Sequence, residues 1–258
     1  MPGQIVQKAV SVSVAVPIGI ATLLRDIVFP PSCAHCHCRT GRHGGLCPRC
    51  WSSMRFIERP FCDVLGTPFS HDPGPGMLSA EAIAHPPVFD RLRSVAVHEG
   101  IARDLVHDLK YRDRTDLAPM MARWMARAGA EALGDCDVVV SVPLHRTRLF
   151  SRKFNQSAEL ARHVARAWKK PFLPLALVRN KKTAQQVGLT ANARALNVRG
   201  AFSVPDTAAA EVFGRRIVLV DDVFTTGATV SAATRALKKA GAREVSVLTF
   251  ARAFSGPI

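Results

Sequence analysis

This sequence has no apolar run long enough to cross a membrane. The uncharged stretch Ala9 to Leu24 is 16 residues long, whereas a membrane-spanning helix needs about 20. Pro17 and Gly19 also interrupt it, and it makes no convincing export signal. We therefore expect a cytoplasmic protein with no transmembrane span, a weak membrane association being the alternative.

Acidic residues are scarce in the C-terminal part of the chain. The whole sequence has 35 Lys and Arg against 20 Asp and Glu, but residues 1–90 are nearly balanced, with seven against six. Residues 145–200 hold thirteen basic residues and one acid, Glu159. A field of that sign attracts polyphosphates or nucleic acid. The plainer alternative is a solvated basic face.

Aromatic residues that could stack on bases are also few, and Tyr111 is the only tyrosine. Stacking on exposed aromatic side chains is a common way to bind single-stranded nucleic acid. Four aromatic residues interleave with the basic run, and the last two of them could equally belong to a core: Phe150, Phe154, Trp168 and Phe172. Any interaction with nucleic acid is therefore predicted from charge more than from stacking.

Cysteines are concentrated in one short segment, where two Cys-x-x-Cys pairs occur. In a chain without an export signal this spacing favours metal over disulfides. Four thiolates can close a tetrahedral site with no open position, which predicts a structural zinc held by Cys33, Cys36, Cys47 and Cys50. Nearby residues that could substitute for one ligand are His35, His37, Cys38 and His43. Downstream, Cys62 has Leu65 where a second pair would need a cysteine, so we expect no second zinc.

The order of apolar segments predicts an α/β protein with a parallel sheet. Strands are expected at Ser94–Val97, Val138–Val142, Leu173–Val178, Ile217–Val220 and Glu244–Phe250. Amphipathic helices are expected between them, including one with Asp116 as N-cap and buried methionines. We divide the chain into an N-terminal amphipathic helix (1–30), a zinc-binding ribbon-like region with an irregular linker over 70–88 (31–88), and the α/β domain (89–258). No internal repeat is evident.

The segment Ile217 to Thr229 carries the strongest functional pattern. An apolar strand is followed by Asp221 and Asp222, which we expect to be solvated at the strand end, and then by small hydroxylated residues that lead into a helix. Such a turn aims backbone N–H groups and a helix N-terminus at one point, which suits a phosphate. The carboxylates suit hydroxyls or a phosphate-bound Mg²⁺.

These thirteen residues resemble the ribose-phosphate motif of type I phosphoribosyltransferases. The resemblance implies that Asp221 and Asp222 hold the ribose hydroxyls of phosphoribosyl pyrophosphate, which binds with Mg²⁺. It also implies a 5′-phosphate cradle formed by Thr225, Thr226, Gly227, Ala228 and Thr229. The basic stretch Arg179–Arg199 lacks periodicity, and we expect a flexible lid there, with Lys181 or Lys182 approaching the pyrophosphate.

The cysteine knuckles, Val142-Pro-Leu-His145, Arg152-Lys-Phe-Asn-Gln156 and the ribose-phosphate motif together are similar to the ComF family. The resemblance implies a zinc-ribbon region before a type I phosphoribosyltransferase-like domain. It also implies a cytosolic role with single-stranded DNA and a DNA-uptake helicase during natural transformation. It further places three residues in the pyrophosphate loop: His145, Arg146 and Arg148.

The sequence is compatible with two functions. One is DNA handling by a protein that binds phosphoribosyl pyrophosphate, with candidate DNA contacts at Arg162, Arg166, Lys169 and Lys170. The other is a true phosphoribosyltransferase of nucleotide metabolism or salvage, in which the ribose passes to a base or amine. No residue identifies the acceptor, so the catalytic residues are unknown.

Overall fold

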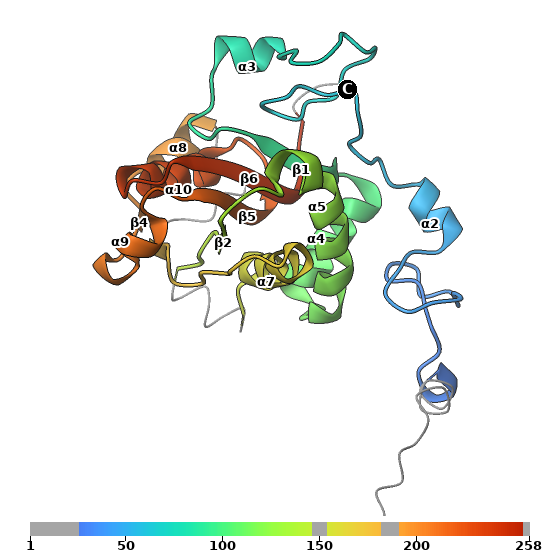
Figure 1. The fold of residues 1–258 in the computed structure, drawn as a ribbon. Coiled ribbons are helices and arrows are strands. Elements are labelled where there is room, and N and C mark those ends of the chain that lie inside the picture. Colours follow the sequence, from blue (N-terminus) through green and yellow to red (C-terminus); the bar gives the residue numbers. More distant parts are fainter. Residues whose placement is uncertain (1–25, 146–153, 182–190, 255–258) are drawn as a thin grey trace, which may run out of the picture.

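A parallel sheet of four strands forms the centre of the α/β domain (Figure 1). The computed structural model describes residues 26–145, 154–181 and 191–254. The strand order is β1-β6-β5-β2, and every neighbouring pair is parallel. The strands are β1 (Leu92–Val97), β2 (Val138–Ser141), β5 (Arg216–Phe224) and β6 (Glu244–Arg252). Their residues are mostly buried, as the continuous apolar runs predict for a sheet covered on both faces.

Helices cover the two faces of this sheet. One layer packs α4 (Gly100–Tyr111), α5 (Ala118–Leu133) and α7 (Gln156–Trp168) against the strands. The other layer contains α8 (Ala191–Val198), α9 (Asp206–Val212), α10 (Ala228–Lys239) and the antiparallel pair β3 (Val178–Arg179) and β4 (Phe202–Ser203). Among the described helices, none combines the length and the apolar character that a membrane span requires. The predicted parallel α/β class is confirmed.

Several local expectations differ from the structure. Strand β3 has two residues, because residues 174–177 form turns and bends and Phe172 makes a single bridge to β2. Asp116 does not cap α5; it lies in a 3₁₀ turn (Thr115–Leu117) and pairs with Arg114, so Leu117 is the N-cap. The expected lid contains helix α8, and its residues 182–190 lie outside the described part of the chain. Most of the expected N-terminal helix also lies outside it.

Residues 55–57 pack along the outer edge of β1. Backbone hydrogen bonds join Ile57 to Val95 and Val97 to Arg55, each at 2.9 Å, so this short segment extends the sheet in antiparallel fashion. Covering an edge strand in this way satisfies its outward-facing backbone groups. Cysteine-containing turns lie on both sides of this segment, one packed in each of the two cores.

Candidate functional site

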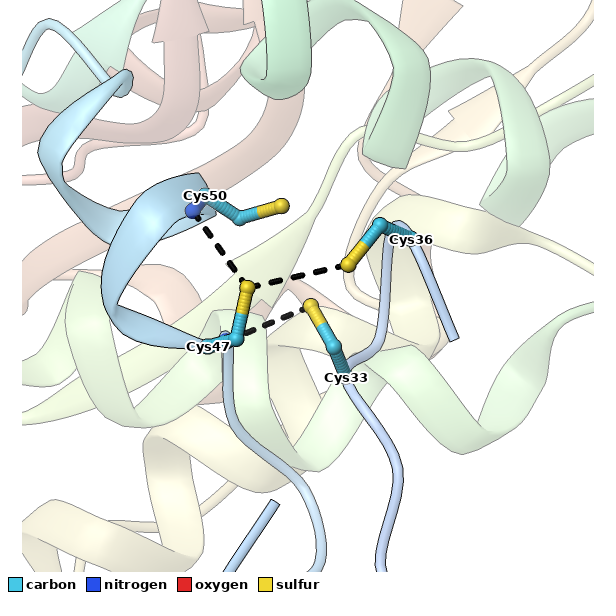
Figure 2. Close-up of side chains that lie close together, drawn as sticks. All are labelled: Cys33, Cys36, Cys47 and Cys50. Carbon is cyan, nitrogen blue, oxygen red and sulfur yellow. Dashed lines mark hydrogen bonds between the residues drawn. The ribbon is translucent and has the colours of Figure 1, made fainter. Parts of the chain in front are cut away.

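Four cysteines from the two knuckles converge on one point (Figure 2). The sulfurs of Cys33, Cys36, Cys47 and Cys50 all lie within 4.8 Å of one another. Sulfurs bound to a tetrahedral zinc at ~2.3 Å are about 3.8 Å apart, and those of Cys36 and Cys47 are 3.6 Å apart. The residues present therefore fit a structural zinc whose four positions are all filled by protein.

Backbone N–H groups around the cluster favour the thiolate form that zinc requires. The Cys47 N–H donates to Cys33 Sγ at 3.3 Å, and the Cys50 N–H donates to Cys47 Sγ at 3.5 Å. The second contact makes Cys47 the N-cap of helix α2 (Pro48–Ser52). The Cys50 N–H also lowers the pKa of Cys47 to about 6. Thiolates are the ligating species, so this contact assists metal binding through Cys47.

His35 links the cluster to helix α4 of the α/β domain and is not one of the four ligands. Its Nδ1 lies 3.5 Å from Cys50 Sγ, and its Nε2 lies 3.3 Å from Asp104 on α4. A side chain that hydrogen-bonds a metal ligand from outside the coordination sphere helps to fix the orientation of that ligand. His43 contacts Asp26 at 2.8 Å instead.

The turn that follows Cys62 repeats the turn that follows Cys33. In the first, the His37 N–H donates to the Cys33 carbonyl at 3.1 Å; in the second, the Gly66 N–H donates to the Cys62 carbonyl at 2.7 Å. His37 and Gly66 have φ angles of 60° and 61°. Each turn is flanked by one antiparallel bridge, at Ser32–Arg39 and Phe61–Pro68. These are two copies of one backbone motif, so the expectation of no internal repeat is wrong.

The helix that completes each copy starts in the same way. Cys47 caps α2 by accepting from Cys50 N–H, and Ser79 caps α3 (Ala80–Ala84) by accepting from Ala82 N–H. An irregular linker is expected over residues 70–88, but the structure forms helix α3 within this range. The second copy thus matches the four zinc ligands with Cys62, Leu65, Ser79 and Ala82. Three of these cannot supply a thiolate, so the residues present do not fit a second zinc.

Two buried arginines of the sheet hold the second copy in place. Arg252 of β6 donates to the Leu65 carbonyl and pairs with Glu81 at 3.2 Å. Arg93 of β1 donates to the Asp63 carbonyl at 2.9 Å. A buried guanidinium needs several acceptors, and the turn carbonyls provide them. The second copy is therefore fixed to the sheet by hydrogen bonds.

The turn after β5 allows a ligand to approach the backbone closely. Gly227 has a φ of +73°, and a Cβ at this position would lie 2.8 Å from the Phe224 ring, so glycine is required. Helix α10 starts at the next residue, while Thr225 and Thr226 are exposed. A helix N-terminus thus meets an open turn of hydroxylated residues, an arrangement suited to phosphate.

The two carboxylates precede this turn inside β5, which continues to Phe224. They are less solvated than expected, because side chains of α4 and α7 reach them. Asp222 is 8% exposed and pairs with Lys110 Nζ at 2.8 Å, while the Ser157 hydroxyl donates to Asp221 at 2.8 Å. Burial and the neighbouring Asp222 charge raise the pKa of Asp221 to about 7.

The other predicted residues are spread over the carboxyl edge and the α7 layer. His145 follows β2, which pairs with β5, so its segment reaches the same edge as Asp221. Asn155 caps α7 and donates to the Val142 carbonyl at 3.0 Å, which confirms the predicted helix start. Arg162, Arg166 and Lys169 are exposed, Lys170 is half-buried and Lys181 is exposed. Arg146, Arg148 and Lys182 lie outside the described residues.

Lys110 and Ser157 were not identified from the sequence as site residues. Lys110 lies in the last turn of α4, whose periodicity predicts only a buried face, and Ser157 follows the predicted helix start by one residue. Neither has a local pattern that points to Asp221 or Asp222.

Trp168, a stacking candidate, donates to the Ala126 carbonyl at 3.1 Å and packs against the core.

The fold and the turn after β5 define a phosphoribosyltransferase-like α/β domain attached to a ribbon module. The phosphoribosyl transferase domain model matches residues 155–257, and the double zinc ribbon domain model matches residues 24–82. DNA utilization protein YhgH of Escherichia coli K12 is 32% identical over 215 residues, which cover 81% of this chain and 91% of that protein. Competence protein F of Haemophilus influenzae is 28% identical over 225 residues, or 84% and 96% of the two chains. The chain belongs to this family, the ComF family.

Among solved structures, the glutamine phosphoribosylpyrophosphate amidotransferase of Bacillus subtilis matches with a TM-score of 0.38 and 24% identity. The match covers 55% of this chain and 30% of the amidotransferase chain. This chain therefore spans less than a third of that enzyme's length.

Proposed function

We propose that this protein binds phosphoribosyl pyrophosphate at the carboxyl edge of its sheet and handles single-stranded DNA during DNA uptake. The observation that carries the first part is the continuous path from Asp221 and Asp222 through the Gly227 turn to the start of α10. Along this path, carboxylate oxygens for ribose hydroxyls precede backbone N–H groups for a phosphate. Ligands of open parallel sheets bind at this edge.

We expect Mg²⁺ to arrive bound to the pyrophosphate of the ligand and not to be a resident metal of the protein. Carboxylate oxygens suit Mg²⁺, but Oδ1 of Asp222 already contacts the Lys110 ammonium at 2.8 Å. A metal carried on the ligand's own phosphate oxygens does not compete with this ion pair. The bound Mg²⁺ would neutralise charge on the pyrophosphate.

Calorimetry with phosphoribosyl pyrophosphate and Mg²⁺ tests the ligand. Asp221→Asn combined with Asp222→Asn should lower affinity at least tenfold, because charged acceptors become weaker amide acceptors. Asp116→Asn is the matched control, since Asp116 is also ion-paired but lies in the 3₁₀ turn before α5. Unchanged affinity in the folded double variant would refute the proposed site.

The DNA part of the proposal is supported by the basic surface of α7 and by the names of the relatives. Arg162, Arg166 and Lys169 point to solvent, and Glu159 is the only acid of that helix. Glu159 lies within 3.4 Å of both Arg162 and His163, so it offsets part of the charge. The remaining positive charge suits a phosphate backbone without sequence preference.

Fluorescence anisotropy with labelled single strands of mixed sequence tests this surface. The test variant replaces four residues of the α7 surface by Glu: Arg162, Arg166, Lys169 and Lys170. The matched control also introduces four Glu residues, at exposed positions in the opposite helix layer and near the amino ends of β5 and β6: Arg215, Arg235, Lys239 and Arg243. Log K of the parent should fall by about 0.7 per neutralised phosphate for each tenfold rise in salt. Equal losses in both variants would show that net charge, and not the α7 surface, sets binding.

The alternative function is phosphoribosyl transfer to a base or amine. It is favoured by the acidic pair, because contacts to Lys110 and Ser157 hold the two carboxyls in place. Turnover of phosphoribosyl pyrophosphate with a panel of bases and amines distinguishes the two functions. Acceptor-dependent release of pyrophosphate would establish the enzyme, and binding without turnover supports the DNA-handling protein.

A further inference from the structure

The end of α4 places a cation inside the proposed ribose site. Lys110 Nζ lies 2.8 Å from Asp222 Oδ1, and the two side chains are only 21% and 11% exposed. By contrast, the Lys238–Asp90 pair has 37% exposure on each side. A sheltered pair is screened little by water, so its geometry is held more firmly than that of a surface pair.

The contacts of the acidic pair are one-sided. Within the part of the chain that the structure describes, Asp221 accepts from Ser157 Oγ at 2.8 Å and from the Asp222 N–H at 2.9 Å, both through Oδ1. Asp222 likewise contacts Lys110 through Oδ1. Among the described residues, neither Oδ2 atom makes a hydrogen bond or ion pair, so Oδ2 is the acceptor atom that each carboxyl has left for a ligand hydroxyl.

Lys110 also affects which of the two carboxyls carries the charge. Two adjacent carboxylates in a sheltered site repel each other, so one of them tends to keep a proton. Asp222 has the ammonium partner, whereas Asp221 has the hydroxyl of Ser157. His98 also faces this pair, and burial together with the charge of Lys110 lowers the pKa of His98.

We propose that Lys110 is a specificity-determining residue, which holds Asp222 as a charged, oriented acceptor and thereby makes the site prefer ribose over deoxyribose phosphates. The inference rests on the proposed ribose phosphate site. A hydroxyl that donates to a charged acceptor forms a strong hydrogen bond, and a ligand lacking it leaves that acceptor without a partner. Lys110 acts through Asp222 and has no contact with the reacting atoms in this proposal, so it is a positioning residue.

The test compares three ligands that share the 5-phosphate: ribose 5-phosphate and its 2-deoxy and 3-deoxy forms. Calorimetry should show that the parent prefers ribose 5-phosphate over at least one deoxy form by about tenfold to a hundredfold. In Lys110→Met this ratio should fall to near one, while affinity for that deoxy form changes little. Lys110→Arg, which keeps the charge, should restore most of the preference. Lys238→Met removes an ion-paired lysine elsewhere and should leave the preference unchanged.

Other outcomes overturn the inference in distinguishable ways. If Lys110→Met weakens all three ligands by the same factor, Lys110 supports the fold and not the specificity. If the parent binds the three ligands equally, no hydroxyl is read at this edge. If the parent binds no phosphosugar, the ribose phosphate site itself is refuted, and the inference with it.

Discussion

Restoring the missing ligands of the second ribbon copy should create a second zinc site. The change is Leu65→Cys with Ser79→Cys and Ala82→Cys, which joins Cys62 to complete the set equivalent to the first copy. The matching turn hydrogen bonds and helix caps imply that the four side chains already start from suitable backbone positions. We expect the parent to hold one zinc per chain and the triple variant to hold two.

The expected energies favour metal binding over the cost of the substitutions. Leu65 is 4% exposed, so shortening it to Cys should cost about 1–3 kcal/mol of folding free energy. Losing the Ser79 cap adds about 1 kcal/mol. Binding zinc at a four-thiolate site contributes on the order of 10 kcal/mol. The variant should therefore be less stable than the parent in chelator and more stable than the parent in zinc.

Metal analysis under reducing conditions, with thermal unfolding in zinc and in chelator, measures both effects. Leu65→Cys alone is the matched control, because two thiols cannot close the site, and it should stay at one zinc. A folded triple variant that keeps one zinc would refute the equivalence of the two copies. Two zincs in the parent would refute the conclusion that the residues present do not fit a second metal.

Three further predictions concern the first ribbon and the site. Removing zinc, or replacing Cys47 by Ser, should increase hydrogen exchange in residues 31–54 and leave the sheet protected, since most residues of the core beneath the first ribbon belong to the strands and helices of the α/β domain; equal loosening of β5 would contradict this. The pKa of Asp221 is raised from 3.8 to about 7, so its protonation stabilises the fold fully below pH 3.8, and this contribution is lost as the pH rises through 7. Asp221→Asn should therefore raise the melting temperature relative to the parent more at pH 8 than at pH 5, and an effect independent of pH would argue against the raised pKa. Gly227→Ala should destabilise the protein by about 1–3 kcal/mol through its positive φ and the Phe224 contact and weaken phosphoribosyl pyrophosphate binding, which calorimetry and denaturant unfolding check together; a stable variant with parental affinity would contradict the close-approach argument.

The sequence alone determined the features that depend on neighbouring residues. Apolar runs predicted the parallel sheet, because a strand covered on both faces has no polar alternation. The Cys-x-x-Cys spacing predicted the zinc ligands, since each pair forms one local turn. The small residues around Gly227 predicted a phosphate turn for the same reason: a positive φ and a following helix start are encoded within a few positions.

Only the tertiary structure decided which distant residues meet. Ser157 reaches Asp221 across 64 positions, and Arg252 reaches Leu65 across 187. No local periodicity contains such pairings, because they arise when crossovers bring separate elements to one edge of the sheet. The second ribbon copy was hidden for a related reason: its backbone hydrogen bonds repeat those of the first copy while its side chains do not. A repeat preserved in backbone geometry becomes visible only when the chain is folded.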